Sequence, residues 1–178
     1  MTAVIAIRRG LPTELSVLTS IDDDSCQLYA ANGIVLGLHA THPFAIAEQA
    51  RWSASLARQS TFIAESVTGR ALGFASCGFV DGEPYLDQLS VRLEAMKQGI
   101  GSRLITEAIS WAEREGGRAI WLTTYAHLPF NRPMYERRGF TIADERACPP
   151  EVLHHVDEQR QWLPLPAERV AMRRPLAN

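Results

Sequence analysis

Three strand-like segments joined by two tight turns are the feature that most constrains how this chain can fold. The segments cover residues 60–66, 70–80 and 84–91, and they are rich in the residues that favour β-structure. Thr68-Gly69 separates the first two segments, and Asp81-Gly82 separates the second and third. Asp-Gly is a strong signal for a hairpin turn. The sequence therefore predicts three consecutive strands joined by hairpins.

The segments before these strands predict one strand and two helices. Thr13 is a candidate cap for the first helix, and the acidic run 22–24 is expected to be a solvated turn or the amino end of the next helix. In the second, weaker helix, Ile46, Trp52 and Leu56 are candidate core residues. The predicted elements are a strand at 3–10, a helix at 12–21 and a helix at about 45–59.

The segments after the three strands alternate between helix and strand. Apolar residues recur at helical spacing until Gly116-Gly117 ends the run; they are Ile100, Leu104, Ile105, Ala108, Trp111 and Ala112. The order predicts an α/β (α+β) fold, with a mixed, mostly antiparallel central sheet flanked by helices in one domain over 1–178. The further predicted elements are a strand at 118–124, a short helix at 131–138, a strand from 140, a helix near 150–160 and a last strand at 169–176.

Gly99 and Gly101 stand directly before the helix that starts near residue 100. Glycine allows tight turns and close approach to the backbone, and the amides at a helix start attract anions, so this loop suggests a phosphate site. A Walker A loop would end in Gly-Lys-Ser/Thr, but Lys97, the only lysine, precedes the glycines. A dinucleotide fingerprint would require a third glycine where Leu104 stands. A capped helix without a ligand is the structural alternative.

Composition narrows the class of protein. The formal net charge of −2 and the pI near 6.2 give no overall drive toward nucleic acid. No apolar run approaches the roughly 20 residues that cross a bilayer, and the amino-terminal run is too short for a signal peptide. The three cysteines are odd in number and lack metal-ligand spacing, which favours reduced thiols. We expect a cytoplasmic protein with no bound metal.

Two sequence blocks carry a resemblance to a known family. The first is "SVRLEAMKQGIGSRL" (90–104), and the second is "LTTYAHLPFNRPMYERRGF" (122–140). Together they resemble the GNAT superfamily of acetyl-CoA-dependent N-acetyltransferases, whose loop is written Q/R-x-x-G-x-G/A. The likeness is strongest over 85–140. Two departures are clear: Met96 stands where the family prefers Gln or Arg, and Leu93 replaces the usual loop proline.

The resemblance implies a role for each matching residue. The backbone of Leu89, Ser90 and Val91 is expected to pair with the pantetheine arm of acetyl-CoA. Asn131 is expected to hold that arm, and Tyr135, one helical turn later, to protonate the departing sulfur. The residues expected to surround the pyrophosphate are Met96, Lys97, Gln98, Gly99, Ile100, Gly101 and Ser102.

The general base is left open between two interpretations of Asp87. Alternation along 84–91 places Tyr85, Asp87, Leu89 and Val91 on one face, where burial would make the lone carboxylate a suitable base. Asp87 could equally pair with an arginine and have no chemical role. Of lower rank as site residues are His127, His154 and His155.

The resemblance implies an acyltransferase that moves an acetyl group from acetyl-CoA to a primary amine of a small molecule or peptide. No nucleic-acid or membrane partner is expected, and the resemblance is compatible with a homodimer. The alternative from another class is a non-catalytic acyl-CoA-binding regulatory domain. Tyr135 and Asn131 favour the enzyme, whereas Met96 and the open question of the base leave room for the alternative.

Overall fold

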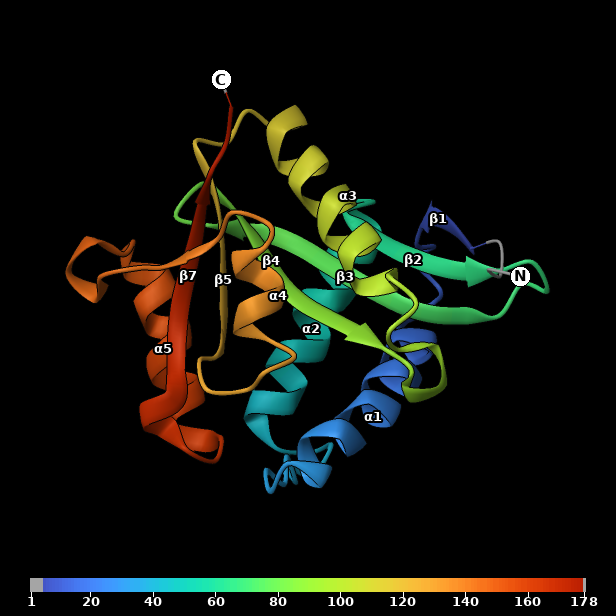
Figure 1. The fold of residues 1–178 in the computed structure, drawn as a ribbon, viewed down its shortest axis with the longest axis horizontal. Coiled ribbons are helices and arrows are strands. Elements are labelled where there is room, and N and C mark those ends of the chain that lie inside the picture. The colour runs from blue at the N-terminus through green and yellow to red at the C-terminus, as the bar shows by residue number, and fades with distance from the viewer. Residues whose placement is uncertain (1–4, 178) are drawn as a thin grey trace. The chain divides into compact units, whose positions relative to one another are not determined.

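The computed structural model describes residues 5–177 and contains a mixed sheet with the strand order β1-β2-β3-β4-β5-β7-β6 (Figure 1). Every described pairing register is antiparallel except that of β4 with β5, which are parallel at Tyr85 and Trp121. The predicted fold class, a mostly antiparallel sheet flanked by helices, is confirmed. The strands are β1 (Ile5–Arg9), β2 (Thr61–Ser66), β3 (Ala71–Val80), β4 (Glu83–Val91), β5 (Ala119–Tyr125), β6 (Thr141–Ile142) and β7 (Arg169–Pro175).

The helices follow the predicted order along the chain. They are α1 (Leu15–Ala31), α2 (Pro43–Ala57), α3 (Ile100–Arg114), α4 (Arg132–Glu136) and α5 (Pro150–Trp162), with short 3-10 turns at η1 (Leu93–Ala95), η2 (Glu145–Ala147) and η3 (Pro166–Glu168). Within residues 5–177, no helix combines the length and apolar character that a membrane span needs. Cys26, Cys77 and Cys148 are free thiols, as predicted.

The described chain divides into two compact units. The first contains residues 5–78 and 87–108, and the second contains 79–86 and 109–177. In the first unit, α1 and α2 pack side by side against β2 and β3. The edge of the Trp52 ring meets Phe74, with ring centroids 5.4 Å apart. The core of this unit is formed by Leu18, Ile21, Trp52, Leu56, Ile63 and Phe74.

The two predicted hairpins form, and a glycine in a left-handed conformation lies in each turn. Gly69 and Gly82 both have φ near +78°, at 79° and 77°, a region that glycine enters at little cost. Asp81 precedes Gly82 with φ 48°, so two consecutive left-handed residues close the β3–β4 turn. Two such residues define the turn that suits the twist of antiparallel strands.

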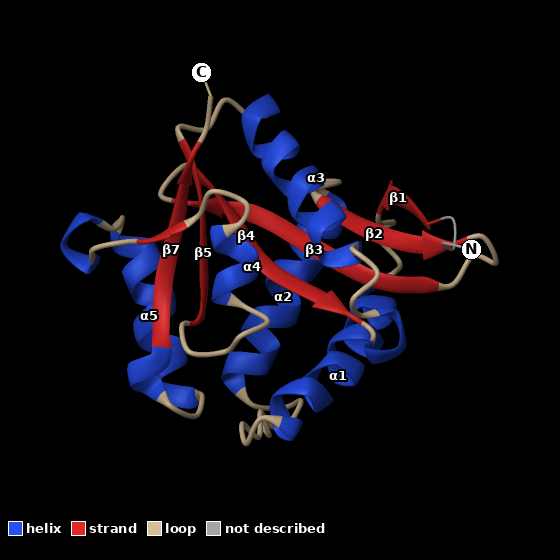
Figure 2. Cartoon of the chain, in the orientation of Figure 1, coloured by secondary structure: helices blue, strands red, loops and turns tan. Residues whose placement is uncertain are grey.

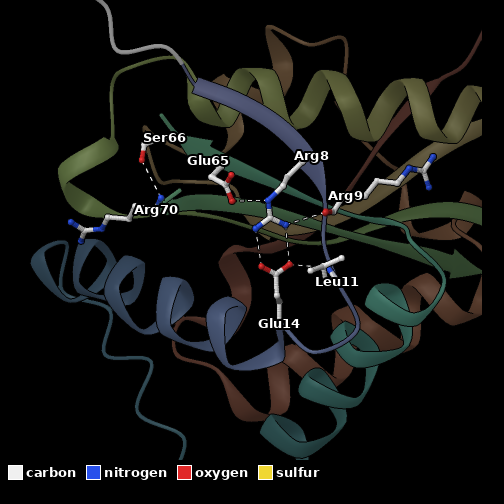
Figure 3. A network of polar contacts seen from close by, with 7 residues as sticks. All are labelled: Arg8, Arg9, Leu11, Glu14, Glu65, Ser66 and Arg70. Carbon is white, nitrogen blue, oxygen red and sulfur yellow. Dashed lines mark hydrogen bonds and ion pairs between the residues drawn. The ribbon is translucent and has the colours of Figure 1, made fainter. Parts of the chain in front are cut away.

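An ion-pair network fixes the start of α1 (Figure 3). The guanidinium of Arg8 on β1 donates to both carboxylate oxygens of Glu14 at 2.8 and 2.9 Å, and to Glu65 on β2 at 2.7 Å. Glu14 also accepts the backbone N–H of Leu11 at 2.8 Å. The Arg8 guanidinium, through its hydrogen bonds, lowers the pKa of the Glu14 carboxyl. The network therefore anchors the amino end of α1 to the first two strands at neutral pH.

Three predictions about the first helices were wrong in detail. α1 continues to Ala31, so Asp22, Asp23 and Asp24 lie within the helix and not in a solvated turn. Glu14, rather than Thr13, occupies the N-cap position, and its side chain makes no capping hydrogen bond. Ile46 is 55% exposed and does not belong to the core, whereas Trp52 and Leu56 do.

In the second unit, β5 pairs with β7 along its whole length, from Ala119–Pro175 to Tyr125–Arg169. The helix α5 lies beside β5 and β7 (Figure 2). Its inner residues Val152 and Val156 are fully buried against Tyr85 and Trp121. The carboxyl-terminal segment thus contributes the helix α5 and the strand β7 to the core of the second unit.

Candidate active site

The glycine loop turns tightly into the start of a helix. After η1 the chain passes through the extended residue Met96 and then Lys97 to Gly99, and α3 begins at Ile100. Lys97 and Gly99 both have left-handed φ angles, of 60° and 78°. The backbone N–H groups at a helix start and the positive end of the helix dipole attract anions. The predicted phosphate loop therefore leads directly into a helix amino terminus.

The carboxyl-terminal end of β4 is held by the acidic run of α1. Ser90 is buried, and its hydroxyl donates to Asp22 at 2.6 Å. The side-chain amide of Gln88 donates to the same oxygen at 2.7 Å. Asp24 accepts the backbone N–H of Leu93, directly after β4, at 2.8 Å. Two of the three carboxylates thus fix the strand that carries Leu89, Ser90 and Val91.

The sequence interpretation missed the contacts of Asp22 with β4, and these contacts place its carboxylate in a buried setting. Burial raises the pKa of its carboxyl, and the hydrogen bonds from Ser90 and Gln88 oppose this rise only in part. The Asp22 residue as a whole is half-buried. The signal in the sequence was the spacing of Leu18, Ile21 and Ser25, all buried on α1, which places residue 22 next to the packed face of the helix.

Asp87 is ion-paired with an arginine, as one of its two sequence interpretations allowed. Its carboxylate is 8% exposed and accepts from Nε of Arg51 on α2 at 2.9 Å. Asp87 reaches α2 while its neighbour Gln88 reaches α1, and these two helices pack together on one face of the sheet. Two consecutive side chains therefore point to the same side, so the predicted strict alternation along β4 is wrong at this position.

The second unit positions Asn131 and Tyr135 on α4. The backbone carbonyl of Asn131 accepts the N–H of Tyr135 at 3.2 Å, closing the single helical turn that places both side chains on one face. Each residue is 8% exposed. The rings of Tyr135 and Phe140 pack edge to face with their centroids 5.9 Å apart, and Phe140 directly precedes β6. This contact fixes the Tyr135 ring within the second unit.

The histidines of lower rank have structural contacts in the second unit. His155 stacks on Tyr85 with ring centroids 5.2 Å apart, and His127 lies 3.5 Å from the carboxylate of Glu168. In the part of the chain that the structure describes, no group of three or more His, Cys, Asp or Glu side chains is arranged to hold a metal ion.

The predicted site residues therefore form two sets, one in each unit. The first unit contains Asp87 and every residue expected to bind coenzyme except Asn131; they are Asp87, Leu89, Ser90, Val91, Met96, Lys97, Gln98, Gly99, Ile100, Gly101 and Ser102. The second unit holds Asn131 and Tyr135.

The sequence pattern of the acetyltransferase (GNAT) family matches residues 35–140, more than half of the chain. The chain belongs to this family. The match spans the strands β2, β3 and β4, the glycine loop, α3 and the block that ends at Phe140.

Solved structures of low sequence identity share the fold of this GNAT chain. A GNAT-family acetyltransferase from Staphylococcus aureus Mu50 has a TM-score of 0.71 at 15% identity, with 98% of this chain and 100% of that chain covered. The PaiA N-acetyltransferase of Thermoplasma acidophilum, solved with coenzyme A, gives 0.69 at 16% identity, with 97% and 99% covered. The N-acetylglutamate synthase of Neisseria gonorrhoeae, solved with coenzyme A and N-acetyl-glutamate, gives 0.66 at 18% identity. The match to the synthase covers 100% of this chain but only 36% of the synthase.

Proposed function

We propose that this chain transfers the acetyl group of acetyl-CoA to a primary amine of a small molecule or peptide. The observation that carries the proposal is the glycine loop, in which left-handed Lys97 and Gly99 lead directly into α3. Membership in an acetyltransferase family supports the transferred group. The PaiA N-acetyltransferase and the N-acetylglutamate synthase, both solved with coenzyme A, support acetyl-CoA as the donor, and the name of the first supports an amine acceptor.

In this proposal each set of residues has a distinct task. The backbone of residues 89–91 pairs with the pantetheine arm as an added strand would, and the amides of residues 96–102 bind the pyrophosphate. Asn131 orients the arm. The phenol of Tyr135, protonated at neutral pH, donates its proton to the sulfur as the carbon–sulfur bond breaks. Holding both substrates in line contributes the remainder of the rate enhancement.

The proposal is tested by a panel of amines with acetyl-CoA and the full chain. We suggest L-glutamate, a peptide with a free amino-terminal alanine, and 1,4-diaminobutane, which differ in the charge around the amine. Release of the coenzyme thiol that depends on the amine would support the proposal. Tight binding of acetyl-CoA without amine-dependent thiol release for any acceptor would contradict it and favour a binding module.

Lys97 offers a test of the loop itself. The Lys97→Gly substitution removes the charge and also relieves the left-handed strain, which costs a residue with a β-carbon about 1 kcal/mol. We therefore expect a slightly higher melting temperature together with CoA binding weakened several-fold, measured by calorimetry. Lys97→Met is the matched control, because it removes the charge and keeps the strain. Parent-like affinity in both variants would make Lys97 an ordinary surface residue.

A further inference from the structure

Asp22 is a carboxylate in the first unit whose hydrogen bonds come from neutral side chains. Its Oδ1 accepts the Ser90 hydroxyl at 2.6 Å and the Gln88 amide at 2.7 Å. Its Oδ2 accepts a long hydrogen bond from the Cys26 thiol at 3.9 Å. Among the described residues, no lysine, arginine or histidine forms an ion pair with Asp22, whereas Asp87 is paired with Arg51 at 2.9 Å. The Asp22 carboxylate is therefore held by neutral donors within the described chain.

We propose that Asp22 is the catalytic base, and that its Oδ2 binds the ammonium group of the acceptor and takes a proton from it. The inference rests on the proposed acetyl transfer and assigns a step that the family resemblance left open. Asp87 is the competing carboxylate, and its ion pair with Arg51 at 2.9 Å already supplies the cation that an acceptor amine would otherwise provide. An amine would have to compete with that arginine at Asp87, but not at Asp22.

The position of Asp22 suits this role because it is tied to the strand proposed to hold the coenzyme arm. Ser90 is its hydrogen-bond donor, and Leu89 and Val91 on either side are the residues proposed to pair with pantetheine. Two turns earlier on α1, the ion pairs of Glu14 with Arg8 fix the start of the helix (Figure 3). Asp24 fixes the chain just beyond the strand through Leu93. The carboxylate is thus rigidly held beside residues 89–91.

The charged groups that surround Asp22 also favour a cationic acceptor. From α1, Asp23 adds a like charge that raises the pKa of Asp22 further. Burial raises the pKa of the Cys26 thiol to about 12, with smaller contributions from the charges of Asp22, Asp23 and Glu48 of α2, so the thiol stays protonated. From β4, the Ser90 and Gln88 side chains are neutral, and Asp87 is ion-paired with Arg51. A base whose pKa is raised is better matched to removing a proton from an ammonium group.

One proton of the acceptor ammonium passes to the Asp22 carboxylate, which leaves a neutral amine with a lone pair. The nitrogen attacks the thioester carbonyl carbon, a carbon–nitrogen bond forms and the carbon–sulfur bond breaks. The leaving thiolate takes the Tyr135 proton, and a second proton from the nitrogen restores the phenol. The third stays on the product amide, and Asp22 releases its proton to solvent.

The test is the pH dependence of kcat/KM for Asp22→Asn, using whichever of the three panel amines the parent acetylates fastest. Asparagine keeps the size and the oxygen that accepts from Ser90 but cannot take the proton. We expect a loss of about 10² near neutral pH that shrinks as the pH rises, because free amine is then abundant. Asp23→Asn, the same charge change at an exposed neighbour, is the matched control. It removes a charge that raises the Asp22 pKa, so it should keep the acid limb and move it to lower pH.

Two further readouts separate a chemical role from a structural one. Burial raises the folded-state pKa of Asp22, so its ionised form opposes folding, and this cost appears as pH rises through the folded pKa. Asp22→Asn should therefore fold with a melting temperature at neutral pH at least that of the parent, and should keep CoA binding. Ser90→Ala removes a hydrogen bond that lowers the Asp22 pKa, so the acid limb of its kcat/KM profile should move to higher pH.

The outcomes distinguish this inference from the proposed function. An acid limb that moves up to the pKa of the free amine in Asp22→Asn, and stays at the parent position in Asp87→Asn, supports the inference. An active parent with an unchanged profile in Asp22→Asn, or one whose acid limb moves only in Asp87→Asn, overturns the inference and leaves acetyl transfer standing. A parent that acetylates none of the three amines overturns both.

Discussion

Replacing Tyr135 with phenylalanine should lower kcat by about 10²–10⁴ and leave KM nearly unchanged. Phenylalanine keeps the ring that packs against Phe140, so the fold and CoA binding should change little. The lost hydroxyl is needed only when charge develops on the sulfur, which is why the loss should fall on kcat. Some turnover should survive, because a thiolate with a pKa near 8.5 leaves without an acid at a reduced rate.

Tyr125→Phe is the matched control in the same unit. The Tyr125 hydroxyl donates to the backbone carbonyl of Pro164 at 2.7 Å, so its loss should lower stability by about 1 kcal/mol without changing kcat. Steady-state kinetics and thermal unfolding of both variants measure the two effects. Full activity in Tyr135→Phe would mean that another donor or a water protonates the sulfur.

Gly101→Val should abolish the stabilisation that CoA gives to the parent. CoA binds the folded state, and at 100 times its dissociation constant it should stabilise the parent by about 2.7 kcal/mol, which is several degrees in melting temperature. Gly101 lies in the first turn of α3, where a branched side chain would stand between the amides and the pyrophosphate. Valine is no poorer a helix former than glycine, so the variant without ligand should fold normally.

Gly78→Val is the control for this substitution, because a β-carbon there meets no atom within 4 Å. It should retain the full CoA-dependent shift in melting temperature. An equal shift in Gly101→Val and the parent would contradict the assignment of the glycine loop to the pyrophosphate.

Much of this fold could be predicted because its signals are local. Gly69 and Gly82 adopt the left-handed conformations that their hairpins need, and the apolar spacing from Ile100 to Ala112 formed α3 as expected. Gly99 likewise has the left-handed φ that a tight turn before a helix requires. In each case the residue type restricts the backbone directly, so distant parts of the chain had little influence.

The features that could not be predicted depend on contacts between residues far apart in the sequence. Three consecutive aspartates resemble a solvated turn, and only Gln88 and Ser90, 66 and 68 residues further on, give Asp22 its buried partners. The sequence did not decide whether Asp87 is a base or an ion-pair partner, because its partner Arg51 lies 36 residues away on α2. The change of side-chain direction between Asp87 and Gln88 likewise has no sequence signal, since it follows from packing against α1 and α2.

The most direct test of acetyl transfer is to follow the acetyl group from ¹³C-labelled acetyl-CoA in the presence of the full chain and the three amines. We expect at least one amine to gain both labelled carbons as an amide, at the rate of thiol release, and Tyr135→Phe to slow both together. Thiol release that leaves the label in free acetate, with no labelled amide on any amine, would contradict acetyl transfer to an amine.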